Sequence, residues 1–403
     1  MMNPLLRSLW RLASPLLRAA LSLLLVYVPV AQAEPAPVLV GMSAEFGHLT
    51  STSDDAIRLG IQIAMDEINR DGGVLNGRPL KLIERDDRSV PARGVANYRE
   101  FAALPDLVAA FCGKFSPVAL EAIPVIHETR LILLNPWSAA DAIVDNGRRP
   151  NYAFRLSLTD SWAVSTMLKS AAARKLYRVG ILAPNTAWGR SSLIAAERHA
   201  ASDKRMKLVG VQWYNWGDTS LVAKYRQLRD AGAQALLLVA NEKEGSVLAK
   251  EMAALAAEER MPVLSHWGIT GGDFVKLTDG ALATIDLSVV QTFSFIGVSG
   301  PAAKRVSAAA LKALNADRVE QIPSPVGLAH AYDLTHLLAR AINKAGSTDR
   351  DAIRSALEQL DEYRGLVKTY ARPFSPQRHE ALAESDVFMA RFEADGSIHR
   401  IRP

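Results

Sequence analysis

Residues 38–87 read VLVGMSAEFGHLTSTSDDAIRLGIQIAMDEINRDGGVLNGRPLKLIERDD and decide the fold. The run 38–42 is short and apolar, as a buried parallel strand is. The apolar residues that follow recur at the spacing of one helix face: Ile57, Ile61, Ala64 and Ile68. Thr52 or Ser53 is expected to cap the start of this helix. A glycine pair then ends it, and the run 80–84 is a second strand, so the stretch predicts one right-handed βαβ crossover.

The N-terminal 33 residues are predicted to be a cleavable export signal. Three arginines and no acidic residue precede an apolar core at 19–30, and Ala31-Gln32-Ala33 is a cleavage motif. Since the apolar core is short for a membrane span, an anchor is the less favoured alternative. The mature chain then has 44 basic and 42 acidic residues, a net charge of +2, which does not indicate a nucleic-acid surface.

The rest of the chain alternates between strand and helix patterns. Strands are expected at 107–111, 131–134, 152–158, 178–183, 208–214, 235–240, 262–266, 285–293 and 387–392. Helices are expected at 91–103, 188–201, 220–231, 244–257, 302–316, 327–345 and 350–360. This alternation predicts the α/β class with doubly wound parallel sheets, whose ligands bind beyond the carboxyl ends of the strands.

The pattern AMDEINRDGGVLNGRPLKLIERDD at 64–87 resembles the type I periplasmic binding proteins, the group that includes the leucine/isoleucine/valine-binding protein. The resemblance implies two doubly wound parallel-sheet lobes joined by three crossing segments. We assign residues 34–157 and 290–363 to lobe 1, and residues 158–289 and 364–403 to lobe 2.

The same resemblance implies a function. We expect a monomeric solute-binding protein in the periplasm that delivers a small organic ligand to an ABC permease in the inner membrane. The alternative is a periplasmic ligand sensor, similar to the amide-binding members, that signals to a membrane partner. The pattern does not identify the ligand.

The turn at 113–116 is the first candidate ligand site. Ser116 and Pro117 suit the start of a helix, whose free N–H groups form a carboxylate site. Ser116 either caps only its own helix or also binds a ligand. The resemblance favours binding, because in this family the matching turn holds the ligand's carboxylate, and it assigns Lys114, Phe115 and Ser116 to the site.

Two further loops resemble ligand-facing loops of the family. Ser138 and Ala139 match small residues that follow a proline, whereas Trp137 stands where a small residue is usual. Its indole either forms a wall of the pocket, which we favour, or packs behind the loop. In the second lobe, Trp188 matches an aromatic residue that closes over the ligand, and Asn241 matches a position that is often aromatic or polar.

Trp267 is the informative departure from the family. Amino-acid binders commonly carry Glu or Asp near this position to pair with the ligand's ammonium group, which is costly to bury unpaired. Either another acid takes this place (Glu242, Glu244 or Asp273), or the ligand has no ammonium group. We favour the second alternative, and the tryptophans suggest an apolar or aromatic acid or amide.

No pattern indicates an enzyme, a metal site or a cofactor. The sequence lacks G-x-S-x-G, the phosphate-binding G-x-x-x-x-G-K-[ST], H-E-x-x-H and a G-x-G-x-x-G motif after a strand. The eight histidines show no recognisable metal-ligand spacing. Cys112 is the single cysteine and so forms no internal disulfide; relatives pair the matching cysteine with one at the position of Ser89. Cys112 is either a reactive thiol or, as we favour, a small buried residue.

Overall fold

The structure is a computed structural model that describes residues 35–48 and 50–401, and its compact unit begins at Pro37. The predicted export signal, residues 1–33, lies outside the described residues. The opening βαβ unit is confirmed: β1 (Val38–Ala44) and β2 (Leu80–Asp86) pair in parallel, with α3 (Thr52–Arg70) between them.

The start of α3 differs from the prediction. The residue before its first turn is Ser51, and no side chain caps the helix. Ser53 lies inside the helix, and its hydroxyl donates to the Gly271 carbonyl oxygen, 218 positions away in the chain, at 3.0 Å. The capping expectation was wrong because this hydroxyl has a tertiary partner that local sequence does not reveal.

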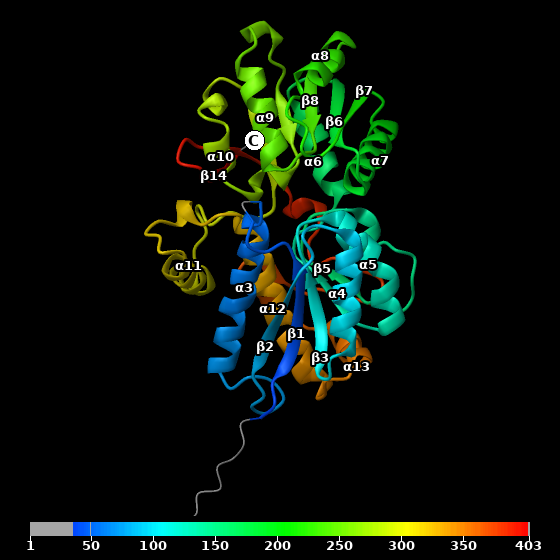
Figure 1. Ribbon diagram of the computed structural model, residues 1–403, viewed down its shortest axis with the longest axis vertical. Coiled ribbons are helices and arrows are strands. Elements are labelled where there is room, and N and C mark those ends of the chain that lie inside the picture. The colour runs from blue at the N-terminus through cyan, green and yellow to red at the C-terminus, as the bar shows by residue number, and fades with distance from the viewer. Residues whose placement is uncertain (1–34, 49, 402–403) are drawn as a thin grey trace, which may run out of the picture. The chain divides into compact units, whose positions relative to one another are not determined.

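The first sheet is parallel throughout, in the order β2-β1-β3-β4-β5. Its other strands are β3 (Leu107–Cys112), β4 (Ile132–Asn135) and β5 (Ala153–Arg155), and its helices α4 (Pro91–Ala103) and α5 (Ser116–Thr129) pack together (Figure 1). β5 is shorter than the predicted strand 152–158. All the residues of β3 and β4 are buried, as expected for a sheet covered on both faces.

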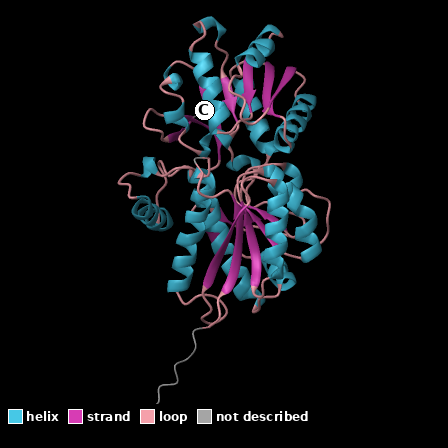
Figure 2. Ribbon diagram, in the orientation of Figure 1, coloured by secondary structure: helices cyan, strands magenta, loops and turns pink. Residues whose placement is uncertain are grey.

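The second sheet has the order β14-β13-β10-β9-β8-β6-β7. Figure 2 shows the strands of both sheets in magenta and the helices around them in cyan. Its strands are β6 (Arg178–Pro184), β7 (Lys207–Tyr214), β8 (Ala235–Leu238), β9 (Val263–Ser265), β10 (Leu287–Gln291), β13 (Phe388–Phe392) and β14 (Ile398–Arg400). The helices of this part are α6 (Asp160–Ala173), α7 (Ala187–Ser202), α8 (Val222–Asp230), α9 (Glu242–Ala253) and α10 (Phe274–Leu277). Strands β6–β10 are parallel, whereas the chain returns at its end to add β13 and β14 as an antiparallel edge.

The chain passes between the two sheets after β5, after β10 and after α13 (Arg350–Leu357), which agrees with the predicted fold class. The last passage contains the small hairpin of β11 (Tyr363–Arg364) and β12 (Thr369–Tyr370). Asp333 binds this hairpin by accepting the backbone N–H groups of Leu366 and Val367 and the Tyr370 hydroxyl. Among the described residues, no helix combines the length and the apolar composition needed to cross a membrane.

Helix α12 (Pro325–Ala345) lies along α3 and completes the core of the first lobe (Figure 1). Tyr332 is buried and donates to Glu67 of α3 at 2.5 Å, so it is a core residue. Gly60 permits the close helix contact, because a Cβ atom there would lie 2.2 Å from the Leu328 carbonyl oxygen. α11 (Pro301–Leu314) also contacts α3.

We predict that Gly60→Ala destabilises the protein. In an exposed helix this change stabilises by up to about 1 kcal/mol, but here the added methyl group meets the backbone of α12, and overpacking of this kind costs roughly 1–3 kcal/mol. Urea unfolding of the two proteins measures the difference. Stabilisation by the substitution would show that α3 and α12 do not approach this closely.

Candidate functional site

The turn between β3 and α5 forms one wall of the predicted site. Phe115 is the residue before the first turn of α5, and its side chain caps nothing. Ser116 is buried, and its hydroxyl oxygen accepts the backbone N–H of Ala140 at 3.3 Å. Ser116 therefore ties this turn to the loop after β4 instead of capping its own helix.

The loop after β4 carries Trp137, Ser138 and Ala139, all buried. The Ser138 hydroxyl donates to the Gly113 carbonyl oxygen at 2.8 Å, so this side chain joins the two loops from behind. Trp137 packs between Gly327 of α12 and Trp267 of the second lobe. Its indole forms part of the wall of a cavity between the loops.

Arg155 holds this loop in place, a role that no local pattern in the sequence predicts. The guanidinium is fully buried and donates to the carbonyl oxygens of Ser138 and Ala140 at 3.2 and 2.9 Å. It also makes a two-pronged ion pair with Glu380, at 2.9 and 2.6 Å. Because the pair lies behind the loop, Arg155 is a positioning residue and does not line the cavity.

The wall from the second lobe is built around Asp160. Its carboxylate accepts the indole N–H of Trp188 at 3.1 Å and lies 3.0 Å from Nε2 of His266. The His266 ring meets Trp188 edge to face, which fixes the indole. Gly268 lies next to this pair, and a Cβ there would be 2.6 Å from the Trp188 ring and 2.4 Å from the Ala240 carbonyl oxygen.

These loops converge on one small cavity of about 10 Å³, the space of roughly one water molecule. Eight of the nine predicted site residues line it: Lys114, Phe115, Ser116, Trp137, Ala139, Trp188, Asn241 and Trp267. Ser138 does not. Pro117, Trp216 and Gly268 complete the lining. Trp216 follows β7, so the rule that ligands bind beyond the carboxyl ends of parallel strands could have identified it from the sequence.

The comparisons with known proteins agree with this architecture. A profile of the family described as "Periplasmic binding protein" matches residues 37–397. The chain belongs to this family.

Relatives and solved structures of periplasmic binding proteins resemble the chain over most of its length. A Leu/Ile/Val-binding protein of Rhizobium johnstonii is 25% identical over 86% of this chain and 89% of its own. A type 1 periplasmic binding protein of Bordetella pertussis has a TM-score of 0.81 at 21% identity and covers 91% of this chain and 100% of its own. A solute-binding protein of R. palustris, solved with 4-hydroxybenzoate, has a TM-score of 0.75 at 15% identity and covers 91% and 96%.

The two lobes of this periplasmic binding protein contact each other across the cavity. The Trp137 and Trp267 rings lie 5.1 Å apart at 33°, and Phe115 meets Trp216 edge to face at 5.0 Å. Away from the rings, the Ser53 hydroxyl bonds to Gly271. The tryptophans thus fill the space between the lobes in this conformation.

Lys114 is the charged group of the cavity. Its side chain is only 4% exposed, and Nζ lies 3.6 Å from a carboxylate oxygen of Glu45. Nζ makes no hydrogen bond to any described residue and lies 4.9 Å from the centre of the Phe115 ring. A buried ammonium without hydrogen bonds is unfavourable, so this group is suited to an incoming acceptor.

Asp54 lies beneath Lys114 at the start of α3. One carboxylate oxygen accepts the backbone N–H of Lys114 at 2.8 Å, and the other accepts that of Glu45 at 3.3 Å. Burial raises the pKa of Asp54 to about 7; the Lys114 charge opposes the shift, and the Asp87 charge adds to it. Burial likewise raises the pKa of Asp87 to about 6.

The three acids considered as partners for an ammonium group differ in position. Glu244 accepts the Gly217 N–H, and Asp273 is exposed and lines a different pocket. Glu242 is buried, and its Oε2 has no hydrogen-bond partner among the described residues. Burial raises the pKa of Glu242, and the Lys114 charge opposes this. None of the three acids lines the aromatic cavity.

Cys112 ends β3 and is 1% exposed. Burial raises the pKa of its thiol, and the Asp54 charge adds to this effect. A thiol that is both buried and hard to ionise is unreactive, which supports the interpretation of Cys112 as a small core residue.

We predict that Glu380→Gln costs about 3–5 kcal/mol of stability, because it leaves the buried Arg155 guanidinium without a counter-charge. The matched control is Glu362→Gln, which removes one carboxylate from an exposed pair with Arg364 and should cost at most about 1 kcal/mol. Urea unfolding measures both variants. Equal, small effects would mean that the Arg155 pair does not hold the loop.

We also predict a pH dependence due to Asp54. Its pKa is higher in the folded than in the unfolded chain, so the folded state binds the proton more tightly, and this contribution is lost as pH rises from about 4 to about 7. Asp54→Asn should remove up to about 1.4 kcal/mol per pH unit from the slope in this window, measured by urea unfolding. An unchanged slope in Asp54→Asn would contradict the shift.

Proposed function

We propose that this protein is a solute-binding protein of an ABC importer and that its ligand is a small organic anion with an apolar or aromatic body and no ammonium group. It acts in the periplasm as a monomer after removal of residues 1–33. It delivers the ligand to a permease in the inner membrane.

The observation that carries the ligand class is Lys114 in the cavity lining, whose buried Nζ has an ion-pair contact with Glu45 at 3.6 Å but makes no hydrogen bond to any described residue. A carboxylate beside it would gain a charge-assisted hydrogen bond, and the ligand's burial would leave the pair little screened by solvent. The same wall contains the start of α5, where Ser116 and the first backbone N–H groups favour a negative group.

The remaining walls support an apolar body. Trp137, Trp188 and Trp267 present ring surfaces, and no carboxylate lines the cavity. Because the cavity holds only about 10 Å³ in this closed arrangement, we infer that ligand entry needs the lobes to separate and the rings to move. Closure then favours the ligand that contacts both walls at once.

An amino acid is the competing ligand class, and Glu242 is the residue that favours it. The unpartnered Oε2 of Glu242 interacts with the charge of Lys114, and the loop at 268–272 lies against the Glu242 side chain. A shift of this loop would expose Oε2 to a ligand's ammonium group. Ligand comparison separates the two classes.

We predict that benzoate and 4-hydroxybenzoate raise the melting temperature of the purified protein, whereas benzyl alcohol, leucine and phenylalanine do not. A ligand at a hundredfold excess over its Kd stabilises the folded state by about 2.7 kcal/mol. Lys114→Met should weaken benzoate binding by roughly 10- to 100-fold, which corresponds to the loss of one charged hydrogen bond. Thermal unfolding and calorimetric titration provide the two measurements.

The control is Lys81→Met, which removes an exposed lysine from β2 of the same lobe. It should bind as the wild type does. The ligand-free Lys114→Met protein is compared by urea unfolding first, because the variant also removes the cation that faces Glu45, Asp54 and Glu242. Strong stabilisation by leucine or phenylalanine alone would overturn the anion proposal in favour of an amino-acid ligand.

A further inference from the structure

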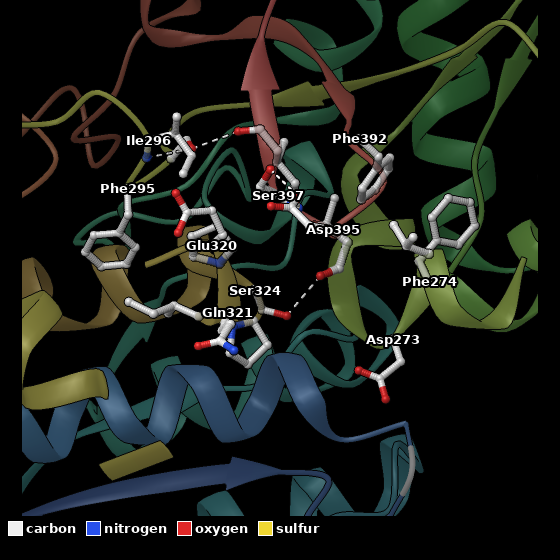
Figure 3. A pocket seen from close by; sticks show the side chains of 18 of the residues that line it. Asp273, Phe274, Phe295, Ile296, Glu320, Gln321, Ser324, Phe392, Asp395 and Ser397 are labelled. Carbon is white, nitrogen blue, oxygen red and sulfur yellow. Dashed lines mark hydrogen bonds between the residues drawn. The ribbon is translucent and has the colours of Figure 1, made fainter. Parts of the chain in front are cut away.

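A second cavity, of about 360 Å³, lies apart from the tryptophan cavity, and its size is within the range of small-molecule sites (Figure 3). Residues of four segments line it. They come from 270–276, from the passage at 294–296, from the segment 319–325 before α12, and from the β13–β14 turn at 392–398. None of the nine predicted ligand-binding residues takes part.

The walls combine aromatic rings with carboxylates. In Figure 3, Phe295 and Glu320 lie on one side of the pocket, and Phe274 and Phe392 lie on the other. The Phe274 and Phe392 rings pack at 5.1 Å. Aromatic faces attract cations as well as apolar groups, so this wall suits an organic cation.

The charges of the lining residues also favour a cation. Asp273, Glu320 and Asp395 line the pocket, against one basic residue, Lys276. Asp395 accepts hydrogen bonds from the backbone N–H and the hydroxyl of Ser397. The carboxylates of Asp273 and Glu320 have no hydrogen-bond or ion-pair partner among the described residues, so both are free to pair with a ligand.

The pocket also joins the two lobes. Segment 319–325 leads into α12, which packs on α3 of the first lobe, whereas α10 and the β13–β14 turn belong to the second. At the pocket wall, the Ser324 hydroxyl donates to the Thr270 carbonyl oxygen at 2.9 Å, which links the two sides (Figure 3). A molecule bound here contacts both lobes and therefore acts on the equilibrium between open and closed forms.

We propose that this pocket is a second, regulatory binding site for a small organic cation: an amine with an apolar or aromatic body, its ammonium group paired with one free carboxylate of the lining, that of Glu320 or that of Asp273, and its body packed on the phenylalanine rings. The bound cation stabilises the closed arrangement. By linkage, it raises the affinity of the tryptophan cavity for its own ligand, and that ligand raises the affinity for the cation by the same factor.

The test compares benzylamine with benzyl alcohol, which has a nearly identical shape and no charge. Benzylamine should raise the melting temperature of the wild-type protein and give a calorimetric binding signal, and benzyl alcohol should do neither. The double variant Glu320→Gln/Asp273→Asn should bind benzylamine at least about tenfold more weakly, as loss of about 1.4 kcal/mol would give. Glu258→Gln, an exposed carboxylate outside the pocket, is the matched control and should bind normally.

Two results would overturn the second site: no response to benzylamine in the wild type, or an equal response in the double variant. The experiment also separates this proposal from the proposed function. Lys114→Met should lose benzoate and keep benzylamine, and the double variant should do the reverse. Saturating benzylamine should tighten benzoate binding in the wild type, and an unchanged benzoate affinity would refute the regulatory coupling.

Discussion

The cleft depends on one buried carboxylate, that of Asp54. It joins the first turn of α3 to the backbone after β1 and after β3, through the N–H groups of Glu45 and Lys114. The preceding residue, Ser53, donates a hydrogen bond to the second lobe, and the rest of α3 packs against α12. The first turn of α3 is therefore where the first sheet, the helices packed on it and the second lobe are joined. The same turn sets the position of the buried ammonium of Lys114.

The features that were predictable from the sequence are those with local or topological signals. The helix spacing of 57–68 and the two flanking apolar runs predicted the βαβ unit. The rule on carboxyl ends of parallel strands selected the loops of Trp188 and Trp267, the family resemblance added Trp137, and all three line one cavity. The missed features are pairings between distant residues. Arg155 and Glu380 are 225 positions apart, and the hydroxyl of Ser116 found a partner in another loop, where no propensity or spacing could indicate the choice.

The two cavities differ in the physical means by which they select a ligand. The cleft is lined by one cation and four indole rings and has almost no free volume. Its selectivity therefore depends on which molecule can replace the contacts between the rings. The second pocket already has space, and its walls offer carboxylates among phenylalanines. Because both cavities are lined from both lobes, neither can be filled without a change in the free energy of closure.

The tryptophan cluster has a spectroscopic consequence. Four of the seven tryptophans line the cleft, and two of them are in ring contact across the lobes. Separation of the lobes would move these indoles from a dry, ring-lined environment into water. The polarity around these tryptophans therefore changes with the domain motion. The fluorescence emission of the unlabelled protein reports whether the cleft is open or closed.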